Sequence, residues 1–344
     1  MTMSDLDPTR KSRELIGFQS SLEEKIIGQQ DAVEAIVDSF EMFRAGLCPA
    51  GRPISNFLFL GPTGIGKTRV VEATAEVLFG DPRAAIKIDC AEFQHSHEIA
   101  KLIGSPPGYL GHRETHPKIT QEALATYHKE GLRLSFLLFD EIEKASDSLW
   151  QLLLGMLDKA TLTLGDNRRV DLSLTMIFLT SNLGAKDITS LFNGAMGFSQ
   201  PQIETQLDNK IDRIAQEAAK RKFSPEFMNR LDKVVVFHPL TSEHLYRILD
   251  IELEIVQNRI LHNDKAQFLF STHESAKKFL LREGTDINYG ARHLKRTIEK
   301  YVVRPMSRLL STEQVKTGDT VVLDWDGHSD YLIFRRDKSR KATA

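Results

Sequence analysis

The 344-residue sequence has only two cysteines, Cys48 and Cys90. They form neither a disulfide framework nor a metal-binding spacing, which favours a reducing compartment, so we expect a cytoplasmic protein. No run of 18 apolar residues is present, so no membrane-spanning helix is predicted. Residues 1–20 form a polar leader without the apolar segment of a signal peptide.

An excess of charge of one sign is also absent, because 45 Lys and Arg residues face 47 Asp and Glu residues. This balance gives no support to a nucleic-acid or membrane partner. The one basic cluster is "RRDKSRK", residues 335–341. It is either a solvated tail or a segment that docks on an anionic partner.

The stretch "NFLFLGPTGIGKT" joins a short apolar run to a glycine-rich loop and a helical pattern that ends at Gly80. Strand, loop and helix in this order are the context of a phosphate-binding loop, whose backbone N–H groups and helix N-terminus bind phosphate. The pattern predicts that Lys67 binds the β- and γ-phosphates of ATP and that Thr68 binds Mg²⁺. The loop residues are Gly61, Pro62, Thr63, Gly64, Ile65, Gly66, Lys67 and Thr68.

A second apolar run, 136–139, ends at Asp140 and Glu141. A carboxylate at the end of a parallel strand can reach the metal of a neighbouring phosphate site, so Asp140 is predicted to bind Mg²⁺. Glu141 is predicted to be the general base that polarises water. The same letters also fit a buried strand followed by an acidic helix cap. A third run, "TMIFLTSN", brings Asn182 toward the same edge.

At this point the sequence resembles the AAA+ ATPases of the Clp unfoldase and disaggregase family, and is most similar to the second ATPase module of ClpB, ClpA and ClpC. The resemblance covers about residues 22–325. The segments that carry it are "IIGQQDAVEAI", "FRAGL", "RPISNFLFLGPTGIGKT", "LIGSPPGYLG", "LLFDEIEKA", "FLTSNLGA", "FSPEFMNRLDKVVVFHPL" and "YGARHLKRTIEK".

The resemblance implies roles for further residues. Ile26 and Ile27 would line the adenine pocket, and Asn182 would be the first sensor of the γ-phosphate. Arg230 would be an arginine finger that reaches the ATP of a neighbouring subunit, and Arg292 would be the second sensor. An ordinary surface salt bridge is the alternative for either arginine.

The segment "GSPPGYLGHRE" resembles the loop that lines the central pore of Clp rings. The resemblance implies that Tyr109, followed by Leu110, grips a polypeptide as a hexamer threads it through the pore. Tyr109 packed against its own domain is the alternative. Because the flank with His112, His116 and Pro117 departs from the relatives, an ATP-dependent assembly switch without threading stays open.

Two further expectations concern partners and extent. Met196, Gly197 and Phe198 resemble the tripeptide with which some relatives dock on a ClpP-like peptidase, so a regulatory cap is a third interpretation. A loop that simply packs onto Phe198 is the alternative. The relatives carry an N-terminal domain and a first ATPase module that the printed sequence lacks. Its beginning, "MTMSDLDPTR", favours a complete single-ring protein over a fragment.

The predicted fold class is α/β. Residues 21–238 would form a large αβα domain with a parallel sheet, and 239–336 a smaller helical α+β domain. "GDTVVLDWDGHSDYLIFRRD" predicts two strands around Asp326-Gly327 in the smaller domain. Residues 337–344 would be a basic tail.

Overall fold

The computed structural model describes residues 6–105, 116–195, 201–263, 267–286 and 290–337. The chain divides into two compact units. The first contains residues 1–62 and 66–238, and the second contains residues 63–65 and 239–344. Across the described ranges, no helix combines the length and apolar character needed to cross a bilayer.

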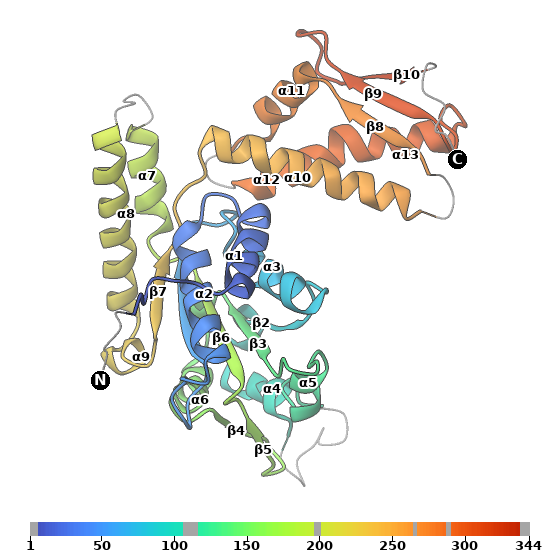
Figure 1. Cartoon of the computed structure of the whole chain (residues 1–344). Coiled ribbons are helices and arrows are strands. Elements are labelled where there is room, and N and C mark those ends of the chain that lie inside the picture. Colours follow the sequence, from blue (N-terminus) through green and yellow to red (C-terminus); the bar gives the residue numbers. More distant parts are fainter. Residues whose placement is uncertain (1–5, 106–115, 196–200, 264–266, 287–289, 338–344) are drawn as a thin grey trace. The chain divides into compact units, whose positions relative to one another are not determined.

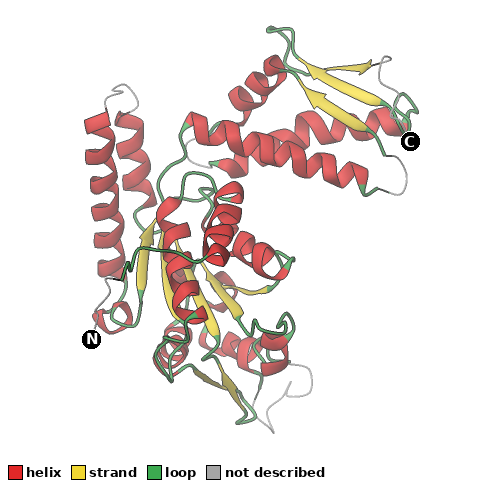
Figure 2. Ribbon diagram, viewed as in Figure 1, coloured by secondary structure: helices red, strands yellow, loops and turns green. Residues whose placement is uncertain are grey.

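A five-stranded parallel sheet forms the centre of the first unit (Figures 1 and 2). Its strand order is β2-β3-β6-β1-β7, so β6 lies between the strand that precedes the glycine-rich loop and the strand that ends at Asp140. This arrangement confirms the predicted α/β class. The strands are β1 (Ser55–Leu60), β2 (Ala85–Asp89), β3 (Ser135–Asp140), β6 (Thr175–Ser181) and β7 (Lys233–Val236).

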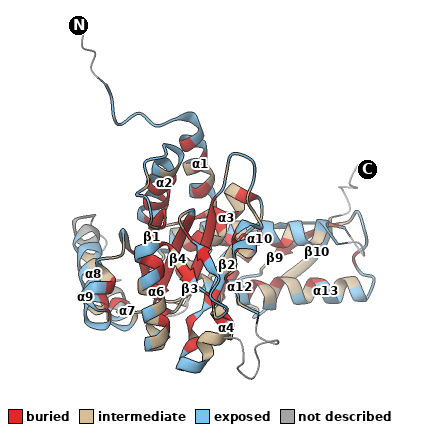
Figure 3. Cartoon of the chain, turned by 90° about the horizontal axis from the view of Figure 1, so that it is seen from below, coloured by how far each residue is buried: buried red, intermediate tan, exposed pale blue. Residues whose placement is uncertain are grey.

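The central strands are buried on both faces, as Figure 3 shows. Alternate residues of β1 point to opposite sides, so Leu58 and Leu60 join one core while Phe57 and Phe59 join another. Phe57 stacks on Phe178 with ring centroids 5.0 Å apart. This double burial explains why the strands read as apolar runs and not as alternating patterns.

Helices cover both faces of this sheet (Figure 1). They are α1 (Arg13–Lys25), α2 (Gln30–Arg44), α3 (Lys67–Phe79), α4 (Ala100–Ile103), α5 (Gln121–Ala125), α6 (Asp147–Lys159), α7 (Ala185–Ala195), α8 (Pro201–Lys222) and α9 (Pro225–Met228). A small antiparallel hairpin, β4 (Thr161–Thr163) with β5 (Arg169–Asp171), follows α6.

The second unit packs helices against a three-stranded sheet of order β10-β9-β8. Its helices are α10 (Ser242–Leu261), α11 (Glu274–Gly284), α12 (Ala291–Ile298) and α13 (Arg304–Ser311), with one π-helical turn at Glu299–Val303. Strands β9 (Thr320–Asp324) and β10 (Ile333–Asp337) are antiparallel, which confirms the predicted pair of strands. Strand β8 (Leu269–Thr272) runs parallel to β9 and was not predicted.

Candidate nucleotide site

The glycine-rich loop joins the end of β1 to the start of α3. Gly66 directly precedes α3 with a φ of 108°, a conformation that residues with a side chain rarely adopt. A Cβ on Gly66 would meet no atom within 4 Å, so glycine is needed here for its backbone conformation and not for space. The N-terminus of an α-helix carries partial positive charge, which suits a phosphate group.

Lys67 is the first residue of α3 and is buried, with an exposed fraction of 7%. Its Nζ donates to the carbonyl oxygens of Gly61 and Pro62 at 2.7 and 2.6 Å. It also donates to Oδ1 of Asn182 at 2.9 Å, so the motif lysine and the predicted sensor lie in direct contact.

Asp140 ends β3 and faces the start of α3. The hydroxyl of Thr68 donates to Asp140 Oδ2 at 3.3 Å, and the hydroxyl of Thr180 donates to Oδ1. The Nζ of Lys87, on the neighbouring strand β2, lies 3.3 Å from Oδ2. The structure therefore brings the two predicted magnesium ligands, Thr68 and Asp140, together at one edge of the sheet.

Glu141 follows Asp140 in a left-handed backbone conformation, with a φ of 56°. Such a conformation is strained for a residue other than glycine and is common at functional sites. Its Oε1 accepts a hydrogen bond from Nδ2 of Asn182 at 3.2 Å. Its Oε2 contacts Nζ of Lys144 at 2.5 Å, and this hydrogen bond raises the pKa of Lys144. Glu141 thus lies at the same edge as Lys67 and Asn182.

Sequence reasoning missed three charged residues of this site: Lys87, Glu143 and Lys144. Glu143 Oε1 accepts from the backbone N–H of Asn182 at 3.1 Å and so fixes the start of the segment after β6. Its other carboxylate oxygen is buried without a hydrogen-bond partner. The spacing of Lys144 three residues after Glu141 was a usable signal, because residues three apart meet on a helical turn.

Arg230 lies at the opposite edge of the sheet. The side-chain amide of Asn56, near the start of β1, donates to the Arg230 carbonyl at 2.9 Å. The glycine-rich loop follows the other end of β1, and a six-residue strand spans about 20 Å. The guanidinium of Arg230 is held within its own chain by Glu226 at 2.9 Å and Asp158 at 3.9 Å. Arg230 is therefore remote from the phosphate loop of its own chain.

The remaining predicted residues stand apart from this cluster. Ile26 and Ile27 are buried between α1 and α2, and their role at an adenine ring stays an expectation. Arg292 is exposed on α12 in the second unit. Tyr109 and Leu110 lie outside the described residues, as do Met196, Gly197 and Phe198. Residues 338–344, the greater part of the expected basic tail, lie outside them as well.

The donor set fits magnesium bound to a nucleotide. Thr68 and Asp140 supply oxygen ligands, which Mg²⁺ prefers, and phosphate oxygens and water usually complete its shell. Among the described residues, no group of three or more histidine, cysteine, aspartate or glutamate side chains is placed to hold a metal ion. Lys67 and the N-terminus of α3 provide the positive charge for the phosphates.

Comparison with known proteins agrees with this geometry. The AAA domain (Cdc48 subfamily) matches residues 52–234. The C-terminal, D2-small domain, of ClpB protein matches residues 240–323. The chain belongs to the Clp branch of the AAA+ ATPase family. The family assignment made from the sequence motifs is thereby confirmed.

The curated relatives are longer than this AAA+ chain. A chaperone protein ClpB of Aquifex aeolicus is 37% identical over 331 residues, which are 96% of this chain and 32% of the relative. An ATP-dependent Clp protease ATP-binding subunit ClpC of Staphylococcus saprophyticus is 37% identical over 98% of this chain and 40% of its own length. The chain thus spans about a third to two fifths of the length of these relatives.

A solved structure has the same fold. It is a closed state of Hsp104 with ATPγS and FITC casein, 29% identical, with a TM-score of 0.76. The match covers 94% of this AAA+ chain and 52% of the Hsp104 chain.

Proposed function

We propose that this chain binds Mg²⁺ and ATP, hydrolyses ATP, and uses the energy to remodel other proteins as part of a cytoplasmic ring, a hexamer. The observation that carries the proposal is the convergence of Lys67, Asp140, Glu141 and Asn182 at one edge of the sheet. A phosphate-binding lysine, a metal carboxylate, a base and a polar sensor are the parts that ATP hydrolysis needs.

Each residue of the cluster has a task in this proposal. Lys67 would exchange its carbonyl partners, Gly61 and Pro62, for phosphate oxygens. Thr68 and Asp140 would hold Mg²⁺, which neutralises charge that develops on the phosphates. Glu141 would accept a proton from the attacking water, and Asn182 would orient both.

Arg230 would act on a neighbouring subunit. Its place at the far end of β1 prevents it from reaching the phosphate loop of its own chain. An arginine supplied in trans stabilises the charge of the transition state and accelerates hydrolysis by about 10³ to 10⁵ in other nucleotidases. The proposed ring would therefore be required for full activity. Arg292, the proposed second sensor, would contact the γ-phosphate.

Threading through the ring pore by Tyr109 is part of the proposal. The described ends of the segment that contains Tyr109 meet, because the N–H of Lys118 donates to the carbonyl of Leu102 at 3.0 Å. The Hsp104 structure with casein supports a polypeptide as the substrate class.

Two other functions are compatible with the same nucleotide site. One is an assembly switch that closes on a partner without threading it. The other is a regulatory cap of a ClpP-like peptidase, which is favoured by the ClpC relative, an ATP-binding subunit of an ATP-dependent Clp protease. Both retain ATP hydrolysis. The switch would not need Tyr109 to grip a polypeptide, and the cap would need Phe198 to dock on the peptidase.

The test is ATP-dependent loss of fluorescence from a fluorescent protein that carries a long unstructured tail. We expect the parent chain to unfold this substrate and Tyr109→Ala to fail while it still hydrolyses ATP. Tyr109→Phe is the matched control, because it keeps the aromatic ring, and it should unfold the substrate. If Tyr109→Ala unfolds the substrate as fast as the parent, threading by this residue is wrong. If the parent hydrolyses ATP without unfolding, the switch is favoured.

A further inference from the structure

Strand β7 is the outermost strand on one side of the sheet, and its outer side pairs with no other described strand. Its one strand neighbour in the described sheet is β1. Among the described residues, no backbone hydrogen bond joins 233–236 to any segment other than β1. Because alternate N–H and C=O groups of a strand point to opposite edges, the outer edge of β7 presents unused backbone donors and acceptors.

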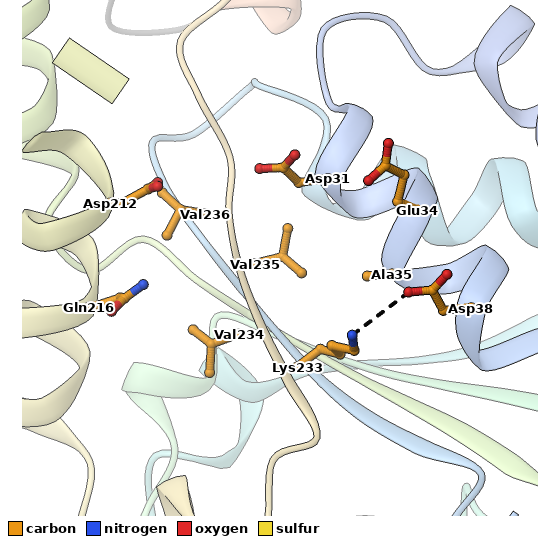
Figure 4. Close-up of a pocket in the computed structure, with 10 residues that line it drawn as sticks. All are labelled: Asp31, Glu34, Ala35, Asp38, Asp212, Gln216, Lys233, Val234, Val235 and Val236. Atoms are coloured by element: carbon orange, nitrogen blue, oxygen red, sulfur yellow. Dashed lines mark ion pairs between the residues drawn. The ribbon is translucent and has the colours of Figure 1, made fainter. Parts of the chain in front are cut away.

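This edge lies at the bottom of a groove between α2 and α8 (Figure 4). The cavity has a volume of about 270 Å³. The outer edge of β7 is therefore recessed between α2 and α8. These two helices would make an added strand lie along β7. The lining residues are Asp31, Glu34, Ala35 and Asp38 from α2, Asp212 and Gln216 from α8, and Lys233 to Val236 from β7.

The two walls of the groove differ in charge. Lys233 and Val235 point toward α2, and Val234 and Val236 point toward α8 (Figure 4). The α2 wall carries three exposed carboxylates, those of Asp31, Glu34 and Asp38. The α8 wall carries one, Asp212, beside the amide of Gln216. An added strand would show alternate side chains to these two walls.

Two of the four carboxylates that line the groove, Asp31 and Glu34, form no ion pair with another described residue. Lys233 lies 3.8 Å from Asp38, and His238 lies 3.2 Å from Asp212. Lys233 is the one lysine or arginine among the residues that line the cavity. Burial of Asp212 raises its pKa, and the charge of Asp31 acts in the same direction, so negative charge on the two walls is mutually unfavourable. Positive charge brought by a ligand would relieve this repulsion.

We propose that the groove binds an extended segment of a partner protein that adds as a strand to β7 and carries lysine or arginine at every second residue. Backbone hydrogen bonds to β7 would supply affinity, as in other complexes formed by strand addition. The basic residues would face the carboxylates of α2, and the intervening residues, such as valine or threonine, would face Val234 and Val236. The surface shares no residue with the nucleotide site.

The experiment measures binding of a fluorescein-labelled peptide, Thr-Lys-Val-Lys-Val-Arg-Thr, to the full chain by fluorescence anisotropy at low salt, where surface charges act most strongly. A second peptide, Thr-Val-Lys-Lys-Arg-Val-Thr, has the same composition without the alternation. A third repeats the first with methylated backbone nitrogens, which removes strand pairing and keeps the charge. We expect the first peptide to bind at least about tenfold tighter than either of the others.

Protein variants locate the binding. The triple variant Asp31→Asn, Glu34→Gln, Asp38→Asn should bind the first peptide roughly tenfold more weakly. The matched control Glu41→Gln, Glu130→Gln, Glu254→Gln changes the net charge equally at exposed positions outside the groove and should bind like the parent. Parent-like ATP hydrolysis by both variants would show that their fold is intact and that the groove is separate from the proposed activity.

Three results would overturn the proposal. If the first and second peptides bound equally well, binding would depend only on charge and not on strand pairing. Equal losses in the two triple variants would place the peptide elsewhere. If a peptide of residues 335–341, "RRDKSRK", displaced the probe with equal affinity, the occupant would be a second copy of this chain and not a separate partner.

Discussion

At the scale of single residues, two neighbours of opposite kind hold the carboxylate of Glu141. The ammonium of Lys144 lies 2.5 Å from one carboxylate oxygen, and the amide of Asn182 donates to the other. A carboxylate oriented in this way can accept a proton from water, which a glutamine of nearly the same size cannot do.

We predict that Glu141→Gln still binds ATP while its turnover falls by about 10² to 10⁴. Fluorescent-nucleotide binding and phosphate release measure the two effects separately. Glu143→Gln is the comparison, because a glutamine carbonyl can still accept the hydrogen bond from the Asn182 backbone. It should lose much less turnover. Normal turnover in Glu141→Gln, or an equal loss in both variants, would contradict the role of the base.

The sequence predicted the residues of the site that belong to a local pattern. Lys67 and Thr68 begin the helix after β1, and Asp140 and Glu141 lie at the end of β3, so the course of the chain brings them to the sheet edge. Lys87 could not be found this way. It reaches Asp140 because of the register between β2 and β3, in which Asp89 and not Lys87 is opposite Asp140. Such diagonal contacts between strands depend on pairing that no local pattern encodes.

At the scale of elements, the apolar runs predicted β1, β3 and β6, the three central strands of the parallel sheet, because burial on both faces makes each run continuous. Strand β8 was missed for the opposite reason. Its residues alternate between exposed and half-buried, and it is a strand because β9 pairs with it. The four-residue helix α9 is equally weak by itself, and its N-cap and Pro225 define it.

Two helix N-caps, Ser224 and Thr241, allow a prediction in which one variant serves as the control for the other. The Ser224 hydroxyl accepts from the N–H of Phe227 at the start of α9, and the Thr241 hydroxyl does the same for His244 at the start of α10. Replacing either by alanine should cost about 1 kcal/mol of stability, measured by urea unfolding. Ser224→Ala should in addition lower ATP turnover of the assembled protein, because α9 leads into Arg230. Equal loss of turnover in Thr241→Ala would show a general effect of stability.

At the scale of the whole molecule, the parallel sheet holds the phosphate loop and Arg230 at opposite ends of its strands. The phosphate loop and the acidic pair lie at the carboxyl ends of the strands, and Arg230 lies at their amino ends. A single chain cannot bring the two ends together, because β1 is rigid and buried along its length. The motif around Arg230 could be recognised in the sequence, but its distance from the phosphate loop came only from the structure.

This separation predicts complementation between two inactive variants. Arg230→Ala keeps an intact phosphate site, and Glu141→Gln keeps an intact Arg230, so each alone should hydrolyse ATP near background. In rings mixed at equal amounts, about a quarter of the interfaces would pair an intact site with an intact arginine, and phosphate release should recover in proportion. Mixing Glu141→Gln with Lys67→Ala is the control, because both sites are then defective and no turnover should return. Mixed rings without recovery, or an active Arg230→Ala protein, would show that Arg230 does not act on a neighbouring subunit.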